Sequence, residues 1–382
     1  MQKMRINAVL LLVGLCVGSV VNAFEVYNSH PGGRAVSMAG AFSAQADDST
    51  AIWYNPAGLK RMSGIKRDFT IEWGQLAARS LAENGVENTS GTGLNTVNEE
   101  ATKTSTLKFM AAYVNKVPYI TSDSIGMGLA FYTPYRLSIN IDQRRSEFDN
   151  RPIGEIELVQ HQLSPVVSYQ LHAGLSVGGG VDVVWNDVTC SEHPACVQNE
   201  AFGYGITAGA IYDLYHAGDS SLKISAVWRT KADVGYKSTG DRGIDSVIED
   251  YMVDRPKSRI IGLSYQAPNR IGVVNSNIQF EKIYWSDSSG GVTDVGDFNN
   301  IGVGAELIIA TGWLRNLALR GGWKRSASDN DNSRYDVVIK SAGLGYAVFN
   351  DHFVDFALER RDSDVTDADS GTALSLSYTY QH

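Results

Sequence analysis

The stretch "LSVGGGVDVVW", residues 175–185, alternates apolar residues with small or polar ones at a period of two. Val181 and Trp185 belong to one set, whereas Ser176 and Asp182 belong to the other. Because successive residues of a β-strand point to opposite sides of its sheet, this pattern predicts a strand with two unlike faces.

The same alternation recurs on both sides of this stretch, for example in "LKISAVWRTK" (222–231), "LALRGGWKR" (317–325) and "TALSLSYTYQ" (372–381). It predicts strands near residues 67–78, 104–117, 124–142, 155–170, 174–188, 200–215, 221–235, 256–267, 273–286, 299–310, 314–325, 335–349, 353–361 and 371–381. The connections between them are alternately long and short. Such alternation is typical of an up-and-down antiparallel meander with two different ends.

The length of these strands and their even number favour a membrane barrel over a soluble sandwich or barrel. Strands of about 10 to 15 residues can cross a bilayer at a tilt, whereas strands of globular proteins average about five or six. Aromatic residues such as Trp185, Trp228 and Trp313 lie near strand ends, as an interfacial girdle requires. We therefore expect an all-β, 14-stranded antiparallel transmembrane β-barrel over residues 67–382.

The N-terminus reads as a signal peptide over residues 1–23. It combines the basic "MQKMR", an apolar run and small residues that end at Ala23. A single N-terminal membrane helix is the alternative. The rest of the chain has no apolar run long enough for a transmembrane helix.

Charge and motifs argue against several classes of protein. A net charge of −9 disfavours a nucleic-acid partner. No GxxxxGK[ST], GxGxxG or GxSxG motif is placed for catalysis or nucleotide binding, and the spacing of His161 and Ser164 puts them on opposite strand faces. We expect no enzyme activity, no cofactor and no metal.

The cysteines of "CSEHPAC", Cys190 and Cys196, lie in a polar loop and are expected to form a disulfide. A metal site with His193 is the alternative, but it would have only three ligands.

Between the signal peptide and the first strand, residues 24–66 form a leader without strand character. Its glycines permit tight turns and its alanines permit close packing in a confined space. "MAGAFSAQA" (38–46) suggests a short helix, and Asn55-Pro56 is a strong turn initiator.

This leader resembles the N-terminal hatch of the FadL/TodX family of outer-membrane transporters for long-chain fatty acids and other hydrophobic compounds. The matching residues are Gly33, Arg34, Ala35, Ser37, Met38, Gly40, Ala41, Asp47, Asp48, Asn55, Pro56 and Ala57. "GMGLAFYTPYRLS" and "LSPVVSYQLHAGLSVGGGVDVVW" are similar to the family's third strand and its fourth and fifth strands. The resemblance covers most of residues 24–382.

The resemblance implies passive uptake across the outer membrane of a Gram-negative bacterium, by a monomer that contacts outer-membrane lipid. A hydrophobic small molecule, a fatty acid or a hydrocarbon, would pass from extracellular loops to a lumen pocket beside the hatch. It would leave through a lateral opening at a kink in the third strand. Gly33, Arg34, Asn55, Pro56 and Ala57 would form the hatch and its gate.

The residues offer candidates for each part of this route. "GIDSVIEDYMVD" (243–254) predicts an amphipathic helix, whose apolar stripe is expected to bind ligand or pack within its loop: Ile244, Val247, Ile248, Tyr251 and Met252. Thr133-Pro134 interrupts a predicted strand, because proline cannot donate to the ladder; the break marks either the kink or an ordinary bulge.

For the lumen pocket, the expected mature N-terminus offers Phe24, Val26 and Tyr27, and Arg229 and Lys231 are expected to neutralise a carboxylate. Such cations also commonly pair with acidic residues in a lumen. The competing function is a non-transporting outer-membrane barrel that acts as a scaffold or secretion accessory. The chain ends in "SYTYQH" rather than in a terminal aromatic residue.

Overall fold

The computed structural model describes residues 30–62, 67–78, 102–113, 125–140, 155–190, 202–235, 254–287, 296–329, 336–349, 351–363 and 371–382. Outside these ranges lie the predicted signal peptide, the pocket residues Phe24, Val26 and Tyr27, the amphipathic stretch from Ile244 through Val247, Ile248 and Tyr251 to Met252, and Cys196. The disulfide and the ligand-binding role of the amphipathic stretch therefore remain predictions.

Most of the described residues lie in long antiparallel strands. The first seven are β1 Arg67–Ala78, β2 Thr102–Tyr113, β3 Ile125–Asn140, β4 Glu155–His172, β5 Leu175–Cys190, β6 Phe202–Ala217 and β7 Ser220–Arg229. They continue as β8 Lys257–Pro268, β9 Gly272–Tyr284, β10 Phe298–Ile309, β11 Leu317–Ser328, β12 Val337–Phe349, β13 His352–Ser363 and β14 Gly371–Gln381. The short helix η3 Trp285–Asp287 follows β9.

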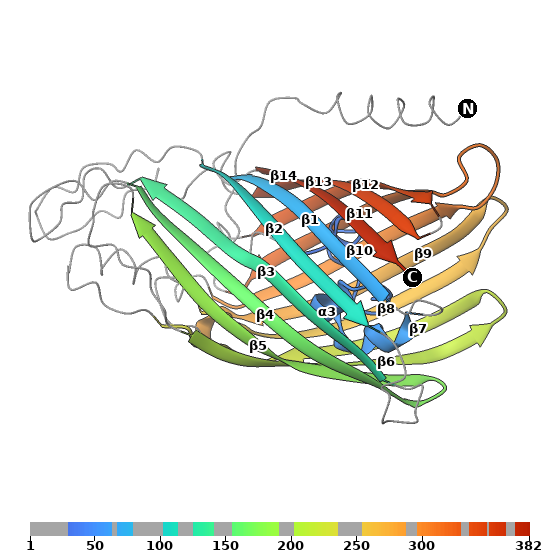
Figure 1. The fold of residues 1–382 in the computed structure, drawn as a ribbon, viewed down its shortest axis with the longest axis horizontal. Coiled ribbons are helices and arrows are strands. Elements are labelled where there is room, and N and C mark those ends of the chain that lie inside the picture. Colours follow the sequence, from blue (N-terminus) through green and yellow to red (C-terminus); the bar gives the residue numbers. More distant parts are fainter. Residues whose placement is uncertain are drawn as a thin grey trace, which may run out of the picture.

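Each strand pairs with its neighbours in sequence, and β1 pairs with both β2 and β14, so that the sheet is a closed barrel (Figure 1). Along the seam, Thr70 of β1 lies opposite Thr379 of β14, and their hydroxyls are 2.9 Å apart. The antiparallel all-β class expected from the alternation is confirmed. Closure matters because an open sheet edge would leave backbone N–H and C=O groups unpaired in lipid.

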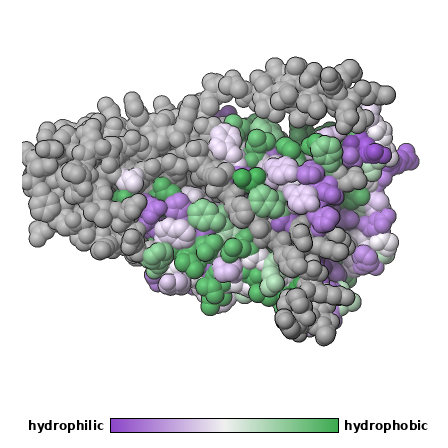
Figure 2. All heavy atoms as spheres, in the orientation of Figure 1, coloured by the Kyte–Doolittle hydropathy of each residue, from purple (hydrophilic) through white to green (hydrophobic). Residues whose placement is uncertain are grey.

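The two faces of the strands are the reverse of those in a soluble protein. On β5, Asp182 and Val184 are buried whereas Val181 is exposed, as the alternation predicts. Large apolar side chains are exposed on the outer face, among them Ile261 and Phe280, and Figure 2 shows apolar side chains across the middle of the side it presents. An apolar outer face is what a barrel in lipid requires.

Residues 30–62, here called the plug, fold inside the barrel (Figure 1). They form helix α2 Gly33–Val36, helix α3 Ala51–Tyr54 and the 3-10 helix η1 Pro56–Arg61. Phe42, Trp53 and Leu59 of the plug share one buried cluster with Tyr132 of β3 and Val166 of β4. Among the described residues, no helix is long and apolar enough to cross a membrane.

The expected helix over residues 38–46 is wrong. Ala39 and Gly40 have φ angles of 53° and 75°, in the left-handed region that a right-handed helix cannot include. Residues 37–50 instead form a series of turns between α2 and α3.

Glycines on the inner wall let the plug approach the strands closely. A Cβ atom added at Gly178 of β5 would lie 2.5 Å from the carbonyl carbon of Pro56, and one at Gly304 of β10 would lie 2.7 Å from the Cβ of Met38. Inward-facing glycines that meet the plug in this way occur on several strands: Gly126, Gly128, Gly178, Gly209, Gly262, Gly304, Gly322 and Gly343.

Candidate functional site

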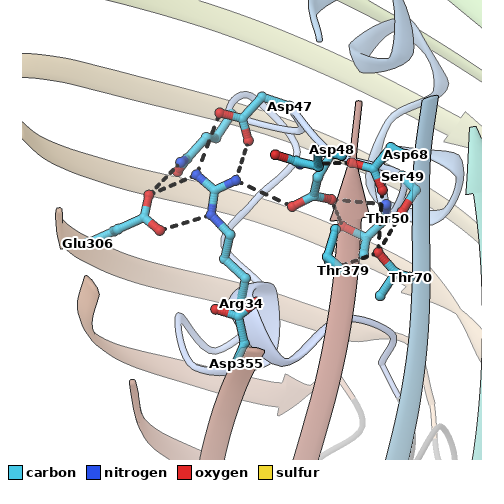
Figure 3. Close-up of polar contacts among 12 residues, drawn as sticks. Arg34, Asp47, Asp48, Ser49, Thr50, Asp68, Thr70, Glu306, Asp355 and Thr379 are labelled. Atoms are coloured by element: carbon cyan, nitrogen blue, oxygen red, sulfur yellow. Dashed lines mark hydrogen bonds and ion pairs between the residues drawn. The ribbon is translucent and has the colours of Figure 1, made fainter. Parts of the chain in front are cut away.

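Arg34 fastens the first half of the plug to the barrel wall (Figure 3). Its Nε and Nη2 each donate to Glu306 of β10 over 2.8 Å, and its Nη1 lies 2.7 Å from Asp47 of the plug. Glu306 also accepts from Gln45 over 3.0 Å and from Arg320 of β11 over 2.7 Å. A carboxylate that is fully buried thus joins two guanidinium groups and the plug to β10 and β11.

Burial and charge act in opposite directions on this cluster. Burial alone would lower the pKa of Arg34, but the charges of Asp47 and Glu306 outweigh it and raise that pKa well above its usual value. Burial raises the pKa of Asp48, while Arg34, 3.3 Å away, acts in the opposite direction. Thr50 donates to Asp48 from its backbone N–H over 2.9 Å. The network therefore keeps Arg34 charged inside the lumen.

Arg61 fastens the other end of the plug. It donates to Ser176 of β5 over 2.6 Å, to Asp213 of β6 over 2.5 Å, and to the carbonyl oxygens of Gly174 and Ile211 over 2.8 and 3.1 Å. Because its guanidinium donates to four acceptors, Arg61 holds η1 against the β4–β5 turn and β6.

The Asn55-Pro56-Ala57 turn lies between these two anchors. The side chain of Asn55 accepts from the N–H of Ala57 and donates to the carbonyl oxygens of Ser43 and Ala210, each over 3.1 Å. Asn55 is fully buried, and Pro56 begins η1. This asparagine therefore closes a turn within the plug and ties it to β6 through Ala210.

Trp53 connects the plug to two strands at once. The guanidinium of Arg229, the last residue of β7, lies 4.9 Å from the centre of the Trp53 ring and also donates to the Trp53 carbonyl oxygen. Trp53 also packs edge-on against Tyr132 of β3, with ring centres 5.0 Å apart. Arg229 also lies 3.9 Å from Glu281 of β9. Trp53 thus couples the plug to β7 and to β3.

Strand β3 is irregular immediately beside this contact. Its register with β4 shifts between Tyr132 and Tyr135, so that Thr133 and Pro134 lie in the irregular part. Tyr132, Thr133, Pro134 and Tyr135 are all buried, which breaks the usual alternation. The sequence predicted an interruption of the strand at Thr133-Pro134. The plug contacts β3 at Tyr132, immediately before this dipeptide.

The other predicted residues lie in different surroundings. Gly33 donates its N–H to Ser377 of β14 over 3.2 Å. Lys231 lies beyond the end of β7 and pairs with Asp233 and, over 3.3 Å, with Asp254. The ligand-binding roles of Arg229 and Lys231 remain predictions.

Sequence reasoning missed Glu306, Arg61 and Trp53. A glutamate at an inward position of an otherwise apolar strand, "VGAELII", was the available signal for Glu306. Nothing in the local pattern marked Arg61 or Trp53, because their partners lie on strands far along the chain.

A closed antiparallel barrel with an apolar outside and a folded segment in its lumen defines a plugged barrel of the outer membrane. Residues 15–239, more than half of the chain, match the family described as "Outer membrane protein transport protein (OMPP1/FadL/TodX)". The chain belongs to this family and is an outer-membrane protein of Gram-negative type. A search of curated proteins found no match.

Solved structures of similar fold include three hydrophobic-compound or FadL-type barrels. The CymD monoaromatic hydrocarbon channel is 16% identical, with a TM-score of 0.63 over 94% of this chain and 99% of that one. The toluene transporter TbuX of Ralstonia pickettii is 15% identical, with a TM-score of 0.60 over 94% and 98%. A FadL homologue of Pseudomonas aeruginosa is 14% identical, with a TM-score of 0.59 over 95% and 98%.

Proposed function

We propose that the protein takes up long-chain fatty acids or other hydrophobic molecules passively across the outer membrane, and that residues 30–62 are its gate. The observation that carries this proposal is the contact of Trp53 with Tyr132 at the edge of the β3 irregularity. A movement of α3 would directly displace β3, the strand at which we expect the barrel to open. Membership of an outer-membrane transport family supports the same reading.

The proposed lumen site lies around Trp53. Aromatic and aliphatic walls suit a hydrophobic ligand, and cations nearby suit a carboxylate. Arg255 is buried and bonded to Asp182, and its Nε has no hydrogen-bond partner among the described residues. With Arg229, it would offer donors to a polar head group. The named ligands of CymD and TbuX support a hydrophobic substrate.

The proposed exit is lateral, beside the β3 irregularity. The pairing of β2 with β3 runs from Phe109–Phe131 to Tyr113–Met127, and Thr133 lies two positions beyond Phe131, the last paired residue. A ligand released at this height could leave through the wall into the membrane rather than pass the plug's whole length. The irregular strand would then serve as the frame of the opening.

A reversible cross-link tests the gate. Ser43 of the plug and Ser225 of β7 have hydroxyl oxygens 3.1 Å apart, so Ser43→Cys/Ser225→Cys would tie the plug to the wall. The variant is made with Cys190→Ser and Cys196→Ser to remove the other cysteines of the mature chain. We expect uptake of a radiolabelled long-chain fatty acid and of toluene to fall at least fivefold when the bridge is formed, and to recover with a reductant.

The matched control is Asn300→Cys/Ser326→Cys, which links the directly paired strands β10 and β11; these two side chains bond each other, and Asn300 also donates to Glu281 of β9. It should leave uptake unchanged. Equal uptake by the oxidised and reduced Ser43–Ser225 variant, with the cross-link verified by mass spectrometry, would contradict the gate. If deletion of the gene also left uptake of every hydrophobic compound unchanged, the scaffold or secretion-accessory function would be favoured instead.

A further inference from the structure

Several strands carry positive charge on the face turned away from the lumen. On β8, Arg259 is exposed between the buried Ser258 and Ile260, and on β13 Arg360 is exposed between the buried Glu359 and Arg361. Lys340 holds the same position on β12. We call six such residues the basic rim: Lys257, Arg259, Lys282, Arg325, Lys340 and Arg360.

The basic rim lies at one height on the barrel. Each of its residues is within four positions of the strand end that leads to a long connection, opposite the short turns 269–271 and 310–316. The next outward residue along the strand is commonly large and apolar: Ile261 after Arg259, Phe280 before Lys282, Trp323 before Arg325 and Leu358 before Arg360. The rim therefore marks the outer boundary of the apolar band, on the side of the longer, extracellular loops.

Within the rim, like charges face each other across strands. Arg259 of β8 is the direct partner of Lys282 of β9, and Lys340 of β12 is the direct partner of Arg360 of β13. Directly opposed like charges destabilise a sheet. Asp362 lies 3.1 Å from Lys340 and 2.7 Å from Arg360, so one carboxylate is shared by two cations.

Arg259 and Lys282 lie, together with Lys257, around the ring of Tyr284. Lys257, Lys282 and Arg259 lie 4.3, 5.3 and 5.6 Å from the centre of the Tyr284 ring. Arg259 has no ion pair with any side chain in the described ranges. The remaining acidic partners of the rim come from beyond the strand ends: Asp287, Asp297, Asp329 and Asp336.

The outward faces of β5, β6 and β7 differ from the basic rim. At the corresponding height on β5, β6 and β7, the outward side chains are Trp185, Phe202, Tyr204 and Trp228. Among the described outward residues of these three strands there is no lysine or arginine. In a chain of net charge −9, the six cations of the basic rim lie on β8, β9, β11, β12 and β13.

We propose that the basic rim binds the phosphate groups of an anionic lipid in the outer leaflet of the outer membrane. Phosphate oxygens placed between Arg259 and Lys282, or between Lys340 and Arg360, would relieve the repulsion within each pair through charge-assisted hydrogen bonds. The acyl chains of the same lipid would lie on Ile261, Phe280, Trp323 and Leu358. This combination of cations above an apolar surface selects a membrane lipid over a soluble anion.

The test compares two double variants that each lose two positive charges. Lys340→Gln/Arg360→Gln removes one rim pair, whereas Arg270→Gln/Arg315→Gln removes two exposed arginines from the turns at the opposite end. Each full-length protein is purified in a non-ionic detergent and titrated with bisphosphorylated lipid A, and bound lipid is counted by native mass spectrometry. Heat-modifiable migration on gels verifies that each barrel is folded.

We expect the Lys340/Arg360 variant to bind lipid A at least tenfold more weakly than the parent protein, and the turn variant to bind it as the parent does. Arg259→Gln/Lys282→Gln should show a similar loss. Dephosphorylated lipid A should bind weakly to all of them. Equal weakening by the turn variant would overturn the proposal in favour of net charge, and undiminished binding by both rim variants would overturn it outright. Full competition by inorganic phosphate at the same concentration as the lipid would overturn the assignment to a lipid.

Discussion

Two glycines on one strand of the wall differ in what they contribute. Gly304 and Gly302 both face the lumen on β10, two residues apart. A Cβ at Gly304 would lie 2.7 Å from the Met38 Cβ and 2.8 Å from its carbonyl oxygen, whereas a Cβ at Gly302 would have its nearest contact at 3.7 Å, with Ala41. Only the first position leaves no room for a methyl group.

Gly304→Ala should therefore displace the plug near Met38 and destabilise the folded protein by about 1–3 kcal/mol, the usual effect of overpacking a close contact. Gly302→Ala is the control and should have an effect below about 0.5 kcal/mol. Thermal unfolding in detergent measures stability, and hydrogen exchange of residues 37–41 locates the change. Similar exchange in both variants would show that the contact with Met38 does not limit packing.

At the same scale, single residues show where sequence reasoning ends. The inward position of Arg229 was predicted from alternation alone, because a strand fixes which face each residue occupies. Its partner Trp53 could not be predicted, because the two residues are 176 positions apart and meet only when the plug folds inside the barrel.

At the scale of an element, one carboxylate ties α2 to β10. Glu306 of β10 accepts from Arg34, Gln45, Asn275 and Arg320, so replacing it leaves several buried donors without their partner. Asp47 and Asp355 would still neutralise the two arginines. The plug's attachment to β10 should therefore fail before the barrel does.

Glu306→Gln keeps the shape but removes the charge, and we expect it to destabilise the plug by about 3–5 kcal/mol, as removal of one buried ion-pair partner does. The measurement is limited proteolysis within residues 30–62, which should become at least tenfold faster while the barrel stays heat-resistant. Lys340→Gln breaks an exposed ion pair and should change neither quantity, since such pairs contribute about 0–1 kcal/mol. Unchanged proteolysis of Glu306→Gln would contradict this role.

The sequence predicted the strands of the barrel wall best, because their residues alternate between the lumen and the outside with a period of two. β3, β5 and β12 begin and end within two residues of their predicted bounds. β7 ends at Arg229 rather than 235, because residues 230–235 leave the ladder and Ala232 bridges to Arg255 instead. The plug was predicted less well, since its short helices and left-handed residues follow the space between walls rather than a repeating pattern.

At the scale of the whole molecule, the last strand closes the barrel. β14 pairs with β13 on one side and with β1 on the other, which joins the last strand to the first. Without β14, both β1 and β13 would present an unpaired edge to lipid.

A chain lacking residues 371–382 should therefore fail to form a heat-resistant barrel in liposomes, as judged by gel migration and far-UV circular dichroism. Removal of His382 alone is the control and should have no effect, because β14 ends at Gln381. A folded barrel without β14 would show that the remaining strands can close by themselves.

The two anchors of the plug also have a mechanical consequence. α2 contacts β12, β13 and β14, while η1 contacts β3 to β6. The plug therefore connects two well-separated parts of the barrel wall. A plug attached at both ends resists deformation of the barrel along the line that joins its two attachments. It leaves the barrel free to deform in the perpendicular direction. The cross-section of this barrel is therefore set by the plug as well as by the number of strands. Detaching either end of the plug would let the wall change shape.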